Sequence, residues 1–129
     1  MNIPPPITRH LQFMKKDTLL CDVWFNAFED KVTFKNHTTD WIDLPFGRMS
    51  DSESTTYSAL EYVLAEDHCF PRERADAAAV LSYLGLEDYD PLAIIQKTHG
   101  VMWNSHIWIK FDTDPPELSW EDVKHLADR

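Results

Sequence analysis

Hydrophobic residues in this chain change their spacing twice, and this feature constrains the fold more than any other. Between residues 18 and 36 apolar and polar residues tend to alternate, which is the pattern of half-buried strands. Between residues 54 and 98 the apolar residues recur three or four positions apart, as on one face of a helix. Alternation returns at 106–111. A chain with this order of elements is predicted to fold as an α+β domain.

The first alternating stretch predicts a β-hairpin. Residues 18–28 are rich in β-branched and aromatic side chains, and 31–36 alternates after a turn at 29–31. We expect 106–111 to join the sheet of this hairpin, because its alternate apolar residues need a buried face. A further short strand is expected at 39–44, since a proline and a glycine follow it.

Helix-capping residues punctuate the middle of the chain. Three segments carry the helical spacing: 54–65, 72–84 and 91–98. Gly85 follows the second segment where helices often end in a left-handed residue, and Leu86 is placed for the apolar contact that accompanies this cap. Asp90 and Pro91 give the third segment an N-cap followed by proline, and Gly100 ends it.

The C-terminal region predicts one more helix. Ser119-Trp120-Glu121-Asp122 resembles a capping box with Asp in place of Glu, so an acidic helix is expected from Trp120 to Ala127. The predicted fold is therefore α+β. It has a small antiparallel sheet, formed by the hairpin and the late strand, which is packed by about three helices and followed by the acidic C-terminal helix.

The same patterns divide the chain into three parts. Residues 1–17 are expected to form an N-terminal arm, because Pro4-Pro5-Pro6 favours an extended start and no clear period follows. Residues 18–111 then form a single α+β domain, and 112–129 form an acidic C-terminal extension with a short helix. The length of 129 residues and the 43% apolar content suit one core without staples.

Composition excludes several function classes. With three glycines the chain lacks phosphate-cradling loops of the Walker or dinucleotide type. Its apolar stretches are far shorter than the roughly 20 residues that span a bilayer, and Met1–Pro6 does not resemble a signal peptide. Cys21 and Cys69 lack CxxC spacing and are interpreted as reduced thiols. A cytoplasmic protein without membrane contact is expected.

No residue cluster has the specificity of a catalytic or metal motif. A metal site would need to bring together His68, Cys69 and Cys21, or else His99 and His106. No pair among them has helical i, i+4 or C-x₂-C spacing. His68 and Cys69 are adjacent, and adjacent side chains rarely face each other, so burial of Cys69 is the simpler interpretation. We expect no catalytic residue, no metal and no cofactor.

Charge is the most unusual bulk property. Twenty-two acids against twelve bases give a net charge of −10, which repels nucleic acid and anionic membranes and attracts basic partners. Asp40–Asp67 contains seven acids and one base, and Asp112–Asp122 contains five acids and no base. Two such blocks favour a basic partner. Solubility is the alternative role of this charge.

The tryptophans are more informative about binding. Trp24, Trp41 and Trp108 fall in predicted strands and are expected in the core or on a sheet face. Trp103 falls in a loop and Trp120 at a helix start among acids, a composition typical of protein-binding surfaces. A lid over the core is the alternative for Trp120. The candidate partner-binding residues are Trp103, Trp120, Asp112, Asp114, Glu117, Glu121 and Asp122.

The motifs between residues 18 and 111 follow one order: a hairpin, a proline-marked turn, a helix, a helix closing on Leu-Gly-Leu and a short helix ending in glycine. This order resembles the small N-terminal subdomain of HipA-type kinases. The residues that carry the likeness are Leu44-Pro45-Phe46-Gly47, Arg74, Leu84-Gly85-Leu86, Asp90, Leu92, Ile94, Ile95 and Gly100.

The chain also resembles short stand-alone proteins of unknown role from Firmicutes mobile elements. The likeness lies in four stretches: Cys69-Phe70-Pro71-Arg72, Tyr89-Asp90-Pro91-Leu92, Lys97-Thr98-His99-Gly100 and Trp108-Ile109-Lys110-Phe111. No kinase catalytic region follows in this sequence, so the resemblance implies no ATP site. It implies a regulatory module that acts as the toxin-neutralising subunits of split HipA-like systems do.

Two function classes remain open. The first is a small non-enzymatic regulatory protein that binds another protein, either antitoxin-like or a mobile-element accessory factor. The alternative is an acidic inhibitor that mimics nucleic acid, such as a phage anti-CRISPR or another anti-defence protein. Both predict a protein partner with a basic surface and no direct contact with nucleic acid. An uncharacterised hydrolase is a third, weaker alternative.

Overall fold

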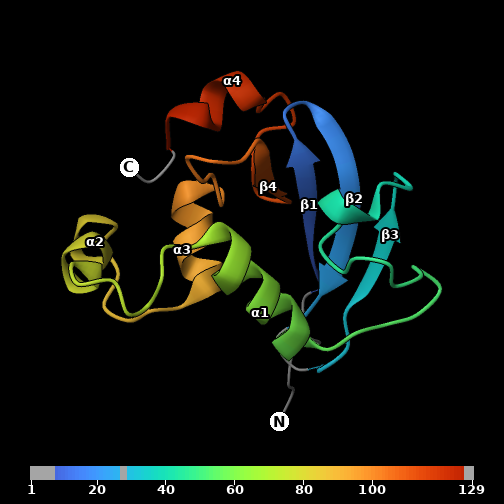
Figure 1. The fold of residues 1–129 in the computed structure, drawn as a ribbon, viewed down its shortest axis with the longest axis horizontal. Coiled ribbons are helices and arrows are strands. Elements are labelled where there is room, and N and C mark those ends of the chain that lie inside the picture. Colours follow the sequence, from blue (N-terminus) through green and yellow to red (C-terminus); the bar gives the residue numbers. More distant parts are fainter. Residues whose placement is uncertain (1–7, 27–28, 127–129) are drawn as a thin grey trace, which may run out of the picture.

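Four antiparallel strands form one sheet in the computed structural model, which describes residues 8–26 and 29–126. The strands are β1 (Arg9–Lys15), β2 (Thr18–Phe25), β3 (Thr33–Asn36) and β4 (Ile107–Phe111). Their order across the sheet is β3-β2-β1-β4 (Figure 1). The predicted hairpin of β2 and β3 is confirmed, and the late strand joins its sheet as expected.

Helices account for most of the remaining regular structure. They are α1 (Tyr57–His68), α2 (Ala77–Tyr83), α3 (Pro91–Thr98) and the single turn α4 (Trp120–Val123). Two 3₁₀ turns accompany them, η1 (Trp41–Asp43) and η2 (Lys124–Leu126). The α+β class is confirmed. Within the described residues no helix has the length and apolar character needed to cross a membrane.

The N-terminal region corrects the predicted arm. Residues 9–15 form β1, which lies in the middle of the sheet and pairs with both β2 and β4. Leu11 and Phe13 are fully buried on one face, while His10 and Gln12 point to the other. Only two apolar residues mark the inward face, so the alternation is too short to be recognised beside the prolines. Residues 1–7 lie outside the described part of the chain.

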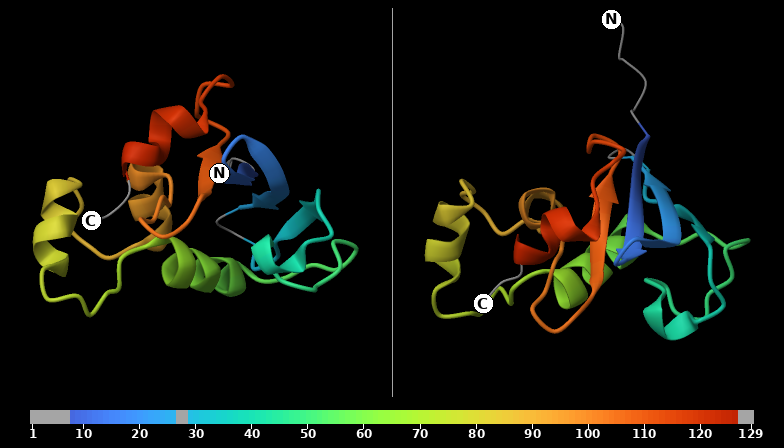
Figure 2. Two further views of the ribbon diagram at one scale, coloured as in Figure 1. Left: turned by 45° about the horizontal axis from the view of Figure 1, so that its top comes forward. Right: turned by 90° about the horizontal axis from the view of Figure 1, so that it is seen from above.

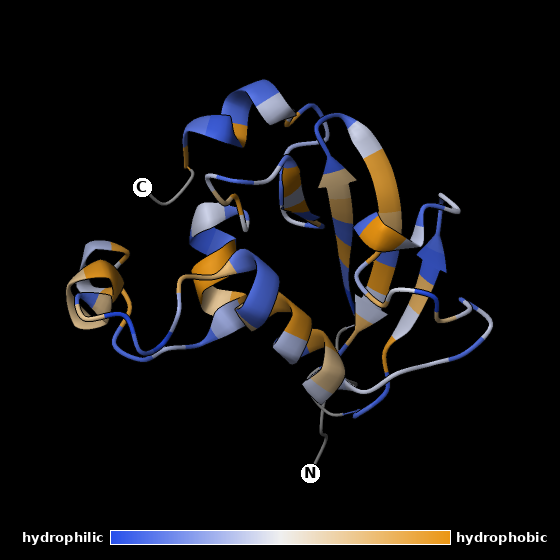
Figure 3. Cartoon of the chain, in the orientation of Figure 1, coloured by the Kyte–Doolittle hydropathy of each residue, from blue (hydrophilic) through white to orange (hydrophobic). Residues whose placement is uncertain are grey.

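The main core lies between one face of the sheet and two helices. Alternation along β1, β2 and β4 buries Phe13, Val23 and Ile109 on this face. Leu60 of α1 and Ile95 of α3 are fully buried against them. Figure 3 shows apolar residues running along the strands and along these two helices. Each such side chain stabilises the fold by about 1.5–3 kcal/mol.

Helix α2 is shorter than predicted. It begins at Ala77 because the chain after Pro71 first makes two tight turns, with hydrogen bonds from Arg74 N to Pro71 O and from Ala77 N to Arg74 O. Of the apolar stripe expected at Ala75, Ala78, Leu81 and Leu84, the two leucines pack on the core together with Ala77, and the two alanines are exposed. The views of Figure 2 place α2 farthest from the strands.

The predicted helix caps are confirmed. Gly85 is left-handed, with φ +77°, and Leu86 N donates to Leu81 O at 2.8 Å, as in the expected C-terminal cap of α2. The Asp90 carboxylate accepts a hydrogen bond from Leu92 N at 3.1 Å and begins α3, which spans the predicted residues.

Residues 39–44 do not form the predicted strand. Hydrogen bonds from Asp43 N to Asp40 O and from Leu44 N to Trp41 O close a 3₁₀ turn instead. Trp41 is consequently 44% exposed rather than in the core, and its ring lies 4.2 Å from the Arg48 guanidinium carbon. These short-range hydrogen bonds form because no strand beside this segment is free to pair with it. The outer edge of β3 is already bound by Asp51 at Asn36 and by Thr55 at Val32.

A second, smaller core cluster lies on the opposite face of β4. It is centred on Trp108, which is fully buried with Val101 and Val123 and whose indole N–H donates to Lys16 O at 2.7 Å. The C-terminal segment covers this cluster. The Asp122 carboxylate accepts a hydrogen bond from Ser119 N at 2.9 Å, which begins α4 as the capping pattern predicts. The helix ends after one turn and continues as η2, and Ala127 lies outside the described residues.

Gly100 offers a direct test of core packing. Its φ of +66° disfavours any side chain, and a Cβ would lie 3.1 Å from His68 Cβ and 3.3 Å from an Ile109 methyl carbon. Gly85 has a similar φ but open space around it. We expect Gly100→Ala to lower the free energy of unfolding by about 2 kcal/mol or more and Gly85→Ala by about 1 kcal/mol. Urea titrations of both variants measure the difference, and equal losses would contradict the close packing.

Candidate functional site

A groove lies where η1, α1 and the loop before β4 meet. Its floor and walls include Phe13, Leu44, Pro45, Val63, Asp67 and Ile107. Ile42 also lines the groove and is 75% exposed, although isoleucine is among the residues most often buried. Contiguous exposed apolar surface, rather than one exposed side chain, marks sites that another molecule covers, and Ile42 extends the apolar lining of this groove to the surface.

The charges around the groove are mostly negative. Lys15 Nζ lies 2.8 Å from the Asp43 carboxylate, so this acid is paired. The Asp67 carboxylate has no hydrogen bond or ion pair within residues 8–26 and 29–126. His68 lies beneath the groove, where burial lowers the pKa of its imidazole, so the ring is neutral at neutral pH. The groove therefore presents an unpaired carboxylate beside apolar surface.

The two candidate tryptophans differ in their surroundings. Trp103 is 76% exposed and precedes Asn104, which lines the groove. Trp120 is half-buried against the Trp108 cluster, and its ring meets the His106 ring edge-on with centroids 5.8 Å apart. Trp120 thus covers the core, as its alternative interpretation expects. Trp103 is the tryptophan that the fold leaves free for contact.

The candidate acids of the C-terminal extension are mostly bound within the chain. Asp112 pairs with Arg9 at 3.0 Å, and the hydrogen bond from Arg9 lowers the pKa of Asp112. Asp114 accepts a hydrogen bond from Phe111 N at 2.7 Å, and Asp122 caps α4. Glu117 and Glu121 are the candidate acids more available to a partner. Glu121 makes an exposed ion pair with Lys124, and Glu117 has no partner in the described part of the chain.

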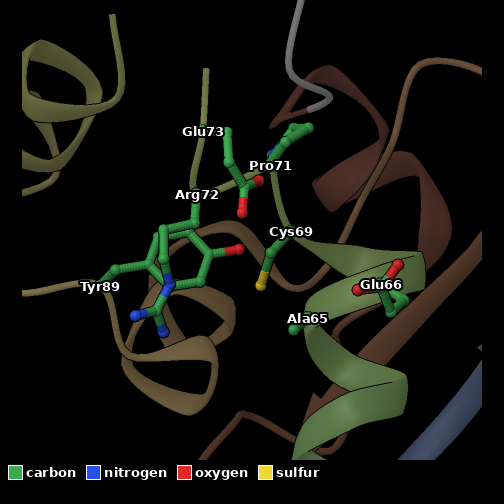
Figure 4. Close-up of a pocket in the computed structure, with 7 residues that line it drawn as sticks. All are labelled: Ala65, Glu66, Cys69, Pro71, Arg72, Glu73 and Tyr89. Carbon is green, nitrogen blue, oxygen red and sulfur yellow. The ribbon is translucent and has the colours of Figure 1, made fainter. Parts of the chain in front are cut away.

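A second cavity, of about 300 Å³, lies between the C-terminal end of α1 and the segment that follows it. Cys69 lies at this cavity together with Tyr89, whose hydroxyl donates to Phe70 O at 2.6 Å (Figure 4). The Arg72 guanidinium carbon lies 4.8 Å from the centre of the Tyr89 ring. Glu66 and Glu73 also line the cavity.

The sequence analysis missed a third feature, on the outer face of the sheet. The Asp22 carboxylate receives His10 Nε2 at 2.6 Å on one oxygen and His37 Nε2 at 2.6 Å on the other, and Gln12 donates at 3.0 Å. The His10 ring stacks on Trp24, with centroids 5.1 Å apart. Recognition of β1 as a strand would have revealed this group, since cross-strand pairing brings its members together.

The protonation state of this group follows from its hydrogen bonds. Burial favours the neutral acid, but the bonds from His37, Gln12 and His10 outweigh it and hold the pKa of Asp22 below its usual value. An ionised carboxylate only accepts hydrogen bonds, so both imidazoles carry a proton on Nε2. Asp22 therefore links β1, β2 and the segment after β3.

The residues considered for metal binding or nucleophilic catalysis are dispersed or inactive. His68 Nδ1 donates to Gly100 O at 3.2 Å, and His99 Nδ1 donates to Ile109 O at 3.0 Å. Burial raises the pKa of both thiols, Cys21 and Cys69, to about 12, so neither forms a nucleophilic thiolate at neutral pH. The described residues contain no group of three or more His, Cys, Asp or Glu placed to hold a metal ion.

No protein-family model, curated protein or solved structure matches this chain. The resemblance to the HipA N-terminal subdomain therefore remains an expectation from the sequence.

The Asp22 group predicts a specific loss of stability. Asp22→Asn places an amide N–H against an imidazole N–H and should lower the free energy of unfolding by about 2–3 kcal/mol at pH 7. Because the folded-state pKa of Asp22 is lowered, its contribution is present above about pH 4 and is lost as pH falls through that lower value. The difference between wild type and variant, measured by urea unfolding, should therefore shrink as pH falls below about 4.

The exposed Asp88 provides the matched control. Asp88→Asn should change stability by less than about 0.5 kcal/mol at any pH. An Asp22→Asn variant that behaves like this control would show that the carboxylate does not hold the strands together.

Proposed function

We propose that this chain is a small, non-enzymatic, cytoplasmic regulatory protein that acts by binding another protein through the groove beside Ile42 and Trp103. The observation that carries the proposal is the exposure of two large apolar side chains: Ile42, 75% exposed, lines the groove, and Trp103, 76% exposed, directly precedes the lining residue Asn104. Aromatic and aliphatic anchors of this kind supply most of the free energy of protein–protein binding. The antitoxin-like or mobile-element accessory role is what the HipA resemblance adds.

The sheet edges support binding by side chains rather than by strand addition. The outward N–H groups of β4 are bound by the chain itself: Ile107 N to Ser105 Oγ, Ile109 N to His99 O and Phe111 N to the Asp114 carboxylate. On the other edge, Asn36 N is bound by the Asp51 carboxylate, and Val32 pairs with Thr55. The β4 edge, whose outward N–H groups are all bound, does not accept a partner strand, and the bonds at Asn36 and Val32 restrict access to the β3 edge.

The placement of the acids favours this proposal over a nucleic-acid mimic. A mimic needs carboxylates that are free to replace phosphates at a basic site. Asp112, Asp114 and Asp122 instead accept hydrogen bonds from backbone N–H groups of this chain. The partner's basic surface is then drawn by the overall charge, while the groove supplies the close contact.

The first test compares two exposed aromatic residues. Trp103→Ala should weaken binding to the partner by about 30-fold, since a buried interface anchor contributes about 2 kcal/mol. Tyr83 is 89% exposed on α2, none of whose residues lines the groove, so Tyr83→Ala should leave binding unchanged. Affinity capture from a host lysate with the three proteins, followed by titration of the captured partner, measures both effects.

Two results would contradict the proposal that the groove is the binding site. One is an equal loss of the same partner in Trp103→Ala and Tyr83→Ala, and the other is full retention of that partner by both variants. A wild-type dimer that Trp103→Ala converts to a monomer, seen by light scattering, would assign the groove to a second copy of the chain.

The second test separates packing from charge mimicry. Glu117→Gln combined with Glu121→Gln removes the two candidate acids that accept no backbone hydrogen bond from the described residues, so the fold should persist. We expect the affinity for the partner to change by less than about threefold. A steep loss of affinity in this variant, together with mutually exclusive binding of this protein and the partner's own nucleic acid, would favour the mimic.

A further inference from the structure

The cavity beside Cys69 combines apolar walls with unpaired charge. Ala65, Pro71 and the Tyr89 ring provide apolar surface around the buried thiol. Figure 4 shows the carboxylates of Glu66 and Glu73 reaching the cavity from different elements, one from α1 and one from the segment after it. Its volume of about 300 Å³ is at the lower limit for small-molecule sites and suits one long side chain.

The charges of this cavity are not balanced. Neither Glu66 nor Glu73 forms an ion pair or hydrogen bond with another described residue, whereas Arg72 is the cavity's single cation. Two carboxylates and one guanidinium leave a net charge of −1. The Arg72 guanidinium carbon lies 4.8 Å from the centre of the Tyr89 ring, so the chain's own cation is held at the ring and the two carboxylates are left to meet an incoming basic group.

We propose that this cavity is a second anchor site, which takes a lysine or arginine side chain of the protein partner. The aliphatic stem packs on Ala65, Pro71 and Cys69, and the charged end lies between Glu66 and Glu73. The inference rests on the proposed protein-binding function and adds the chemistry of the partner. A site of this charge also agrees with the net charge of −10, which draws basic surfaces toward the chain.

A carboxylate-bearing partner is the opposing occupant, because Arg72 makes no ion pair with another described residue. The geometry disfavours it, since an incoming carboxylate would meet two unpaired glutamates in the same cavity. The two occupants differ in sign, so small ions of opposite charge distinguish them.

The experiment is an NMR titration of the full-length protein with argininamide, lysinamide and acetate at low salt. Argininamide or lysinamide should shift the amide signals of residues 65–73 and of Tyr89, and acetate should not. The Glu66→Gln, Glu73→Gln double variant should weaken the cation's binding by about tenfold, as expected for two exposed ion pairs. Binding should also weaken when salt is raised from about 20 mM to 200 mM.

Glu61→Gln is the matched control, because Glu61 is an exposed acid of the same helix that does not line the cavity. It should leave the titration unchanged. The proposal is overturned if neither cation shifts these signals, if the double variant binds them as wild type does, or if acetate binds in their place.

The partner itself provides the last outcome. In lysate capture, the double variant should bind the partner about tenfold more weakly, and Glu61→Gln should not. If Trp103→Ala loses the partner while the double variant retains it in full, the groove stands and the second anchor fails. If wild type binds argininamide but captures no protein, the cavity is a cation site and the proposed function fails.

Discussion

The pairing of β1 with both of its neighbours is the constraint on which the rest of the structure depends. β1 joins β2 through a tight turn and joins β4 from almost the other end of the chain, with Leu11 opposite Phe111 and Phe13 opposite Ile109. One face of this pairing supports the main core under α1 and α3. The other face supports the Trp108 cluster and the C-terminal segment that covers it. Without β1, β4 would have no partner strand in the sheet.

The turn after β1 also positions the candidate binding groove. Lys15 holds η1 through Asp43, and Lys16 N donates to His106 O at 2.9 Å, which holds the loop before β4. Asp17 accepts a hydrogen bond from Trp120 N at 2.9 Å and so fixes the start of α4. Three consecutive residues thereby hold both walls of the groove and the cover of the second cluster. The exposed position of Ile42 is a consequence of this arrangement and not of local disorder, because η1 is tied down at Asp43.

The sequence predicted those parts of the fold that depend on short-range chemistry. The bounds of α3 and the cap at Gly85 were predictable because each is determined by residues within one helical turn. The position of β1 was not, because its only inward apolar residues are Leu11 and Phe13 and its place in the sheet is determined by a strand about 100 residues away. The strand predicted at 39–44 was wrong for the opposite reason. Local hydrogen bonds between residues i and i+3 formed there, because no neighbouring strand had a free edge.

The candidate site was predictable only in part for a similar reason. Charge and composition indicate where acidic residues lie, but the fold determines which of them are bound within the chain. The acidic extension was recognised as a surface, yet most of its carboxylates are used to bind backbone N–H groups, which no count of charges reveals. Asp22 went unnoticed because a single aspartate has no pattern until its strand neighbours are known. A binding surface is therefore better defined by the groups that the fold leaves without partners. By that criterion Ile42 and Trp103 support the proposal of a partner that is both apolar and basic, and so do the carboxylates of Asp67, Glu66 and Glu73, which are paired with no other described residue.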